Sequence, residues 1–155
     1  MSGGLTFYNC QNLITVNMPK LTAISSYAAF NKCEKLININ MPSLTTINED
    51  RVFSNCYSLQ DVAFPSLITI SDDDIFSGCK NLVNIDMPNL TTLDGKYIFG
   101  GCSNLVKINM PKLVKIDGDS IFQDCVKLPL RLNFPSLKEV NGFFDGRVFL
   151  SLIHI

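Results

Sequence analysis

The sequence of this 155-residue chain lacks several features that would point directly to a function. No apolar run reaches the roughly 18 residues needed to span a bilayer, so we expect no membrane insertion. The opening residues, Met1 to Gly4, carry no basic side chain and do not look like a secretory signal peptide. With 13 basic and 14 acidic residues, the formal net charge of −1 gives no electrostatic case for a nucleic-acid partner.

Signs of catalysis are also scarce. The one histidine, His154, stands next to the last residue without an obvious partner, and no nucleophile motif, phosphate loop or zinc signature is present. Acidic turns at residues 72–74 and 117–119 have the charge to hold calcium. They lack the spaced ligands of the known calcium loop, and capping or solubility explains them better. We therefore predict a protein that is not an enzyme and has no catalytic residue, cofactor or metal.

What the sequence does contain is a repeat. Its six cysteines recur every 23 residues, at Cys10, Cys33, Cys56, Cys79, Cys102 and Cys125. A phenylalanine stands three residues before each of them, and leucine, isoleucine and proline also keep fixed places between them. One such unit cannot bury its apolar residues alone, but stacked coils can, because each column then packs on its own copies. This predicts a single solenoid domain over residues 1–155, with repeats from about residue 5 to residue 152.

The spacing within the unit predicts its local structure. In the pattern L-x-x-I-x-M-P the Ile and Met are two residues apart, on one face of a strand, and the proline ends that strand. A column of Ser, Asn and Asp, from Ser25 to Asn141, is typical of helix caps and turns. The predicted fold is an α/β leucine-rich-repeat solenoid of about six coils. It has a parallel β-sheet on one face and short turns or single-turn helices on the other.

The cysteine column does not suit disulfides. Equivalent residues of neighbouring coils lie about 4.8 Å apart with parallel Cα–Cβ bonds. A disulfide needs Cβ atoms that converge to about 3.8 Å. We therefore predict six free, buried thiols that pack as small hydrophobic side chains.

The full unit, C-x-x-L-x-x-I-x-M/F-P-x-L-x-x-I-x-x-x-x-I-F-x-x-C, covers residues 5–140 and resembles the BspA-like, or treponemal-type, leucine-rich repeat. That family has Gly or Ala before the Phe, where this chain has Val52, Ile75, Ile98 and Ile121. The resemblance implies a non-catalytic binding module, because such repeats occur mostly in surface proteins that bind host proteins, other cells or glycans. It also implies a cell-surface or secreted location, although this chain shows no signal peptide.

The candidate ligand-binding face consists of the outward positions of the main strands. These are Thr15, Asn17, Asn38, Asn40, Asp61, Asn84, Asp86, Lys107, Asn109, Arg131 and Asn133. A stripe of amides about 5 Å apart is suited to a polar chain such as a glycan or a peptide. Stacked Asn side chains can equally bond to one another and only stabilise the sheet. The neighbouring Ile14, Ile37, Val83 and Val106 give the face an apolar edge. The first hypothesis is protein or glycan recognition, or adhesion, through this face.

The second hypothesis is a structural subunit that self-associates end to end. Solenoids need capped ends to stay soluble, and open ends expose core columns and strand edges. The C-terminal end is strongly apolar, and its candidate interface residues are Leu150, Leu152, Ile153 and Ile155.

Overall fold

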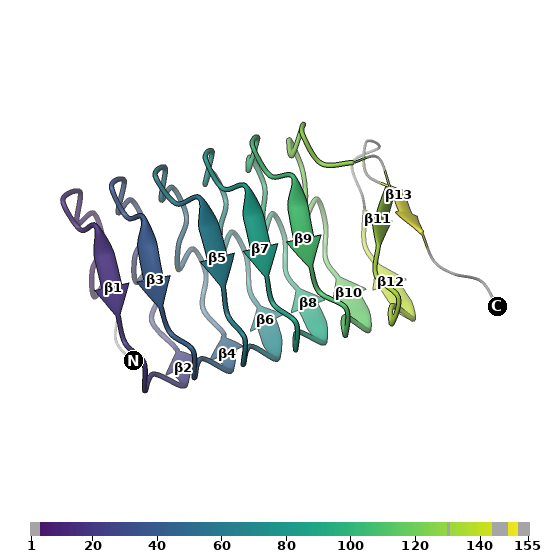
Figure 1. Ribbon diagram of the computed structural model, residues 1–155, viewed down its shortest axis with the longest axis horizontal. Helices are drawn as coiled ribbons and strands as arrows, with labels where there is room; N and C mark the ends of the chain where they lie inside the picture. The colour runs from purple at the N-terminus through teal and green to yellow at the C-terminus, as the bar shows by residue number, and fades with distance from the viewer. Residues whose placement is uncertain (1–3, 130, 144–148, 152–155) are drawn as a thin grey trace.

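The computed structural model describes residues 4–129, 131–143 and 149–151, which form a solenoid of stacked coils (Figure 1). Each coil runs along three walls. The first is the strand wall, built from the strand that precedes each proline of the repeat and from one last strand near the C-terminus. It comprises β1 (Thr15–Asn17), β3 (Asn38–Asn40), β5 (Asp61–Ala63), β7 (Asn84–Asp86), β9 (Lys107–Asn109), β11 (Arg131–Asn133) and β13 (Phe149–Ser151). All pairings are parallel, in the groups β1-β3, β5-β7-β9 and β11-β13.

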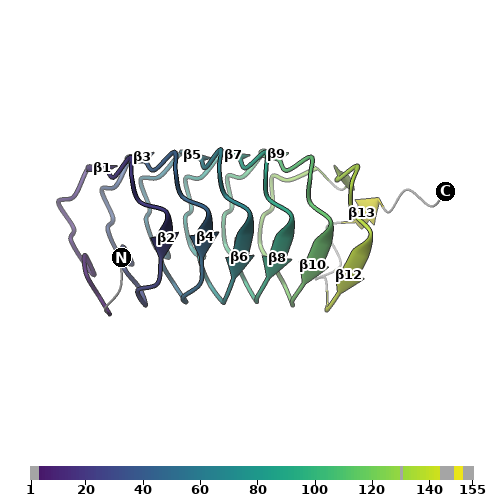
Figure 2. The same ribbon diagram turned by 90° about the horizontal axis from the view of Figure 1, so that it is seen from below.

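A second sheet follows each proline and runs the length of the solenoid (Figure 2). Its strands are β2 (Ala23–Ile24), β4 (Thr46–Ile47), β6 (Thr69–Ser71), β8 (Thr92–Asp94), β10 (Lys115–Asp117) and β12 (Glu139–Asn141). Paired residues are 23 apart, as Thr46 and Thr69 are, except that Lys115 pairs with Glu139 after the one inserted residue. Five turns therefore separate the first strand of this sheet from the last. The parallel strand wall is confirmed, and a second parallel sheet stands beside it.

The third wall, here called the turn wall, comprises residues 27–32 and their equivalents in the other coils. The prediction of single-turn helices is wrong here, since the described residues contain no helix. Two residues per coil have positive φ, at Leu5, Asn9, Ala28, Lys32, Arg51, Asn55, Asp74, Gly78, Tyr97, Gly101, Ser120 and Asp124. A left-handed residue every few positions cannot continue a right-handed helix.

Hydrogen bonds between coils replace the expected helical bonds. The N–H of Phe30 donates to the carbonyl oxygen of Val52 at 2.8 Å, and that of Phe53 donates to Ile75 at 2.8 Å. The Ser, Asn and Asp column that predicted helix caps lies at strand ends instead, where Ser25 Oγ donates to Asn48 Oδ1 at 2.9 Å. The fold is therefore a parallel β-solenoid, because turn-wall N–H groups such as those of Ala28, Phe30 and Lys32 donate to carbonyl groups of the next coil.

The core between the walls consists of the repeated apolar columns. The Phe column, Phe7 to Phe122, is one continuous stack with ring centroids 5.1 to 5.5 Å apart and planes 4 to 10° from parallel. The leucine column beside it is fully buried from Leu36 to Leu105. Each ring and each leucine covers its own copies, as the repeat predicts.

The cysteines are all free, and five of them are buried. Each buried thiol donates to the carbonyl of a phenylalanine 26 residues earlier, such as Cys79 Sγ to Phe53 O at 3.1 Å. Cys10 is exposed, so the prediction of six buried thiols is wrong at this position. The reason is that Cys10 has no residue 26 positions earlier in this chain to lie against.

Thiol reactivity should follow this difference. Burial raises the pKa of Cys33 to about 11 and that of Cys125 to about 12, which leaves little of the reactive thiolate near neutral pH. We expect iodoacetamide to modify only Cys10 in the native protein and all the cysteines in denaturant, as counted by mass spectrometry. Cys10→Ser should abolish native labelling. Rapid modification of Cys79 in the native protein would contradict the burial of the cysteine column.

Candidate functional site

The structure brings the predicted ligand-binding residues onto the outer face of the strand wall. From Thr15 to Asn133 they are exposed, except for the half-buried Asn84. Between them Val16, Val62 and Ile85 point into the core. The alternation predicted for these strands is therefore confirmed, whereas ligand binding at this face stays a prediction.

Several of these side chains bond to their copies in the next coil. Asn40 Nδ2 donates to Asn17 Oδ1 at 2.8 Å. Asn84 Nδ2 donates to Asp61 Oδ1 at 2.6 Å, and Asn109 Nδ2 donates to Asp86 Oδ1 at 2.7 Å. These ladders support the stabilising role that the sequence left open. They also hold the amides in one orientation, with further donor and acceptor capacity facing solvent.

An apolar edge lies beside the ladders, at the residue before β1, β3, β7 and β9; before β5 this position is Gln60. Ile14, Ile37 and Val106 are 53%, 45% and 49% exposed, and Val83 is half-buried. The backbones of this edge bond from coil to coil, as where Ile37 N donates to Ile14 O at 2.9 Å. The strand wall therefore presents apolar and polar side chains side by side on a fixed backbone.

The predicted end interface is mostly outside the described residues. Leu150 lies in β13, whose backbone pairs with that of Leu132 in β11. Leu152, Ile153 and Ile155 lie outside the described residues, as does His154. End-to-end association stays a prediction of the sequence.

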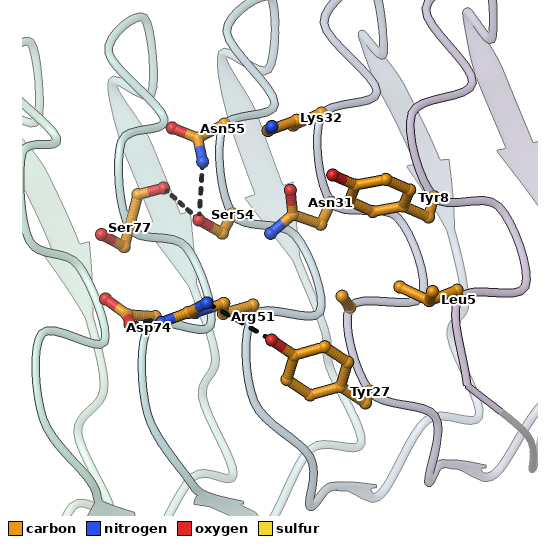
Figure 3. A pocket seen from close by; sticks show the side chains of 11 residues that line it. Leu5, Tyr8, Tyr27, Asn31, Lys32, Arg51, Ser54, Asn55, Asp74 and Ser77 are labelled. Carbon is orange, nitrogen blue, oxygen red and sulfur yellow. Dashed lines mark hydrogen bonds and ion pairs between the residues drawn. The ribbon is translucent and has the colours of Figure 1, made fainter.

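Sequence reasoning missed a groove on the turn wall. Its larger part, a hollow of about 520 Å³, is shown in Figure 3. It is lined by Leu5, Tyr8, Tyr27, Ala28, Asn31, Lys32, Arg51, Ser54, Asn55, Asp74 and Ser77. A second hollow of about 280 Å³ shares Asp74 and Ser77 and continues to Tyr97, Gly100 and Gly101. We call the two together the turn-wall groove.

Small residues form the floor of this groove and larger ones form its rim. In successive coils the same position holds Tyr8 and then Asn31, Ser54, Ser77 and Gly100. That column of small and polar residues was the available signal. It pointed to a groove only once the segment was known to be an open wall.

The rim holds a connected set of polar side chains. Arg51 Nη1 donates to the Tyr27 hydroxyl at 3.3 Å, and Arg51 Nε donates to Asp74 Oδ2 at 3.4 Å. The Tyr27 phenol and the Asp74 carboxylate together raise the pKa of Arg51. On the floor, Ser54 Oγ donates to the Ser77 carbonyl at 3.0 Å and accepts from Asn55 Nδ2 at 3.1 Å (Figure 3).

Asn31 differs from its neighbours on the floor. It is only 5% exposed, yet no described residue bonds to its side-chain oxygen Oδ1. A buried amide oxygen without a partner costs free energy, and such groups are rare in folded proteins. Asn31 is therefore the least satisfied polar side chain of the groove.

The acidic turns cap backbone N–H groups. Asp50 Oδ1 accepts from Asp73 N at 2.9 Å, Asp73 Oδ1 accepts from Lys96 N at 2.6 Å, and Asp119 Oδ1 accepts from Phe143 N at 2.8 Å. Burial, together with the nearby acids of which Asp50 contributes most, raises the pKa of Asp72. Within the described ranges no group of three or more His, Cys, Asp or Glu side chains is placed to hold a metal ion. The same ranges hold no helix of the length and apolar character that crossing a bilayer requires.

Comparison with known proteins gives a consistent result. Residues 3–129 match the model of the BspA type leucine rich repeat region in six copies. The crystal structure of the Treponema pallidum leucine-rich repeat protein is similar at 26% identity with a TM-score of 0.57, over 82% of this chain and 70% of that one. A leucine-rich repeat protein from Bacteroides ovatus shares the fold at 19% identity with a TM-score of 0.58, over 92% of this chain and 49% of its own. No curated protein sequence matches this chain.

Proposed function

Because this chain belongs to the BspA-type leucine-rich repeat family, whose repeats are generally protein-interaction scaffolds, we propose that it is a protein-recognition module that binds its partner on the strand wall. The family and the similar solved structures are non-enzymatic repeat scaffolds. The proposed function is accordingly binding through surface contacts, without a catalysed reaction.

The apolar edge beside the amide ladders is the observation that carries this proposal. Protein interfaces combine an apolar centre with a polar rim, and exposed apolar residues in a contiguous patch mark such surfaces. Ile14 and Ile37 are adjacent in the stack and about half exposed. A partner that covers them would also meet the amides of Asn17 and Asn40, which are already oriented by their own hydrogen bond.

Rigidity favours the same surface. Backbone bonds between coils and side-chain ladders hold the face in one arrangement before any partner arrives. Little side-chain freedom is then lost on binding, and such preorganisation increases affinity. None of the candidate ligand-binding residues from Thr15 to Asn133 is aromatic. The face therefore suits a protein surface better than a sugar ring.

A charge-insertion variant tests the proposal. The double variant Ile37→Asp and Val106→Asp places carboxylates on the apolar edge, and we expect it to weaken binding to a protein partner at least about ten-fold. The measurement is binding of the labelled chain to an array of purified proteins, followed by titration of each protein that it retains.

The matched control is Ile68→Asp with Val114→Asp, since these side chains are 46% and 36% exposed on the second sheet. It should bind the same proteins as the unmodified chain. The proposal is overturned if the two double variants lose binding equally, or if the edge variant retains it.

A further inference from the structure

We propose that the turn-wall groove is a second, separate binding site, and that its ligand is a neutral oligosaccharide. This inference does not depend on the strand wall or on its protein partner. It goes beyond the family's general role as a protein-interaction scaffold.

The groove has the size and position of a ligand site. Its larger hollow, of about 520 Å³, falls within the range of about 300–1,000 Å³ that is typical of small-ligand sites. The adjoining hollow of about 280 Å³ continues it across the next coils through Asp74 and Ser77. An elongated groove across successive coils suits a short chain of linked rings better than a single small molecule.

Most backbone N–H groups of the floor already have acceptors, so the floor offers few donors to an extended peptide. Ala28 N donates to Asp50 O at 2.9 Å, and Lys32 N donates to Ser54 O at 2.9 Å. Between them Phe30 N donates to Val52 O at 2.8 Å and Asn31 N donates to Ala28 O at 3.1 Å. Extended peptides are usually captured by backbone hydrogen bonds at a sheet edge. Recognition in this groove must come mainly from side chains.

Asn31 identifies the kind of group that binds. Its buried Oδ1 lacks a partner among the described residues, so it needs a hydrogen-bond donor. A carboxylate or a phosphate dianion has no proton to donate. Lys32 (+1) and the ion pair of Arg51 (+1) with Asp74 (−1) leave the lining with a net charge of +1, which disfavours a cation. A hydroxyl both donates and accepts, so it satisfies the amide in either orientation of its oxygen and nitrogen.

The rim supplies apolar ring faces. Tyr27 is 42% exposed and lies on the rim beside Arg51 (Figure 3). Tyr8 is 41% exposed and lies beside Asn31 at the end of the floor (Figure 3), with Lys32 Nζ 5.8 Å from its ring centroid. A tyrosine combines an apolar ring with a polar tip, and the C–H face of a pyranose ring can lie against it. The Tyr27 hydroxyl accepts from Arg51, which leaves its own proton free to donate to a ligand oxygen. Hydroxyl-rich rings with apolar faces are the ligand class that meets both requirements.

The test uses an array of immobilised neutral, sialylated and sulfated oligosaccharides, probed with the labelled intact chain. The strongest neutral glycan is then titrated by calorimetry. We expect Tyr27→Ala to lower its affinity at least about ten-fold, and Tyr27→Phe to lower it less because the ring is kept. Tyr57→Ala is the matched control, since Tyr57 packs under Lys80 outside the groove and should leave affinity unchanged.

Asn31→Leu separates binding from folding. It removes an unpaired buried acceptor, so the unfolding midpoint should stay the same or rise while glycan affinity falls. If Asn31 were only structural, both would fall. The assignment is overturned if no neutral oligosaccharide binds, or if neither Tyr27→Ala nor Asn31→Leu changes the glycan affinity. It is also overturned if only charged glycans or unglycosylated polypeptides bind through these residues. The strand-wall variant Ile37→Asp with Val106→Asp should keep its glycan binding, so that either proposal can fail alone.

Discussion

Replacing Phe76 with alanine is expected to destabilise the protein by about 3–5 kcal/mol. The Phe76 side chain is fully buried. Its ring is stacked between those of Phe53 and Phe99, with centroid distances of 5.3 and 5.4 Å. The ring centroid of Phe64 lies 6.4 Å away. Its removal leaves a gap in the middle of the phenylalanine stack. The walls cannot close this gap, because Phe76 N is held by the Ile98 carbonyl at 2.7 Å.

The measurement is urea unfolding followed by circular dichroism and by tyrosine fluorescence. Two probes are needed because solenoids can unfold one section at a time, and coincident curves justify a single free energy. Phe143→Ala is the control, since Phe143 is 71% exposed, and its effect should stay within about 0.5 kcal/mol. A similarly small effect of Phe76→Ala would mean that the stack contributes little to stability.

Replacing Gly95 with alanine is expected to cost at least about 2 kcal/mol. Gly95 has a φ of +139°, which L residues rarely adopt. An added Cβ would also collide with the backbone carbonyl of Asp72 in the preceding coil. That oxygen belongs to the main chain and cannot rotate away, so relief requires the two coils to separate. Asp72 N donates to Asp94 O at 2.8 Å between the same two coils, and separation would strain this bond as well.

The same unfolding experiment checks this expectation. Gly4→Ala is the control, because nothing lies within 4 Å of the Cβ it would add. Gly118 repeats the geometry one coil later, where a Cβ would meet the carbonyl of Gly95. Gly118→Ala should therefore behave like Gly95→Ala. Wild-type stability of both variants would show that the coils can move apart here without cost.

The candidate sites could be read from the sequence only in part. The outward positions of the strand wall followed from the two-residue alternation around Val16 and Val62, and the structure places them as expected. The ladder from Asn40 to Asn17 was one of two open alternatives, and side-chain geometry was needed to establish it. The turn-wall groove was missed because its lining comes from several coils. No local pattern shows that Tyr8, Asn31 and Asp74 line one hollow.

The sequence by itself determined the repeat, the core columns and the stacking of parallel strands. Apolar residues at one fixed period, such as the column from Phe7 to Phe122, can be buried together only if identical coils stack. The tertiary structure alone decided the form of the third wall. Ser, Asn and Asp favour helix caps and turns alike, so the column from Ser25 to Asn141 did not distinguish them. Hydrogen bonds between coils decided between the two, since the N–H of Phe30 donates to the carbonyl of Val52, 22 residues away in the next coil. Such a partner exists only once the coils are stacked, and it favours the turns over the single-turn helices that the sequence equally allowed, which gives an open wall with a groove.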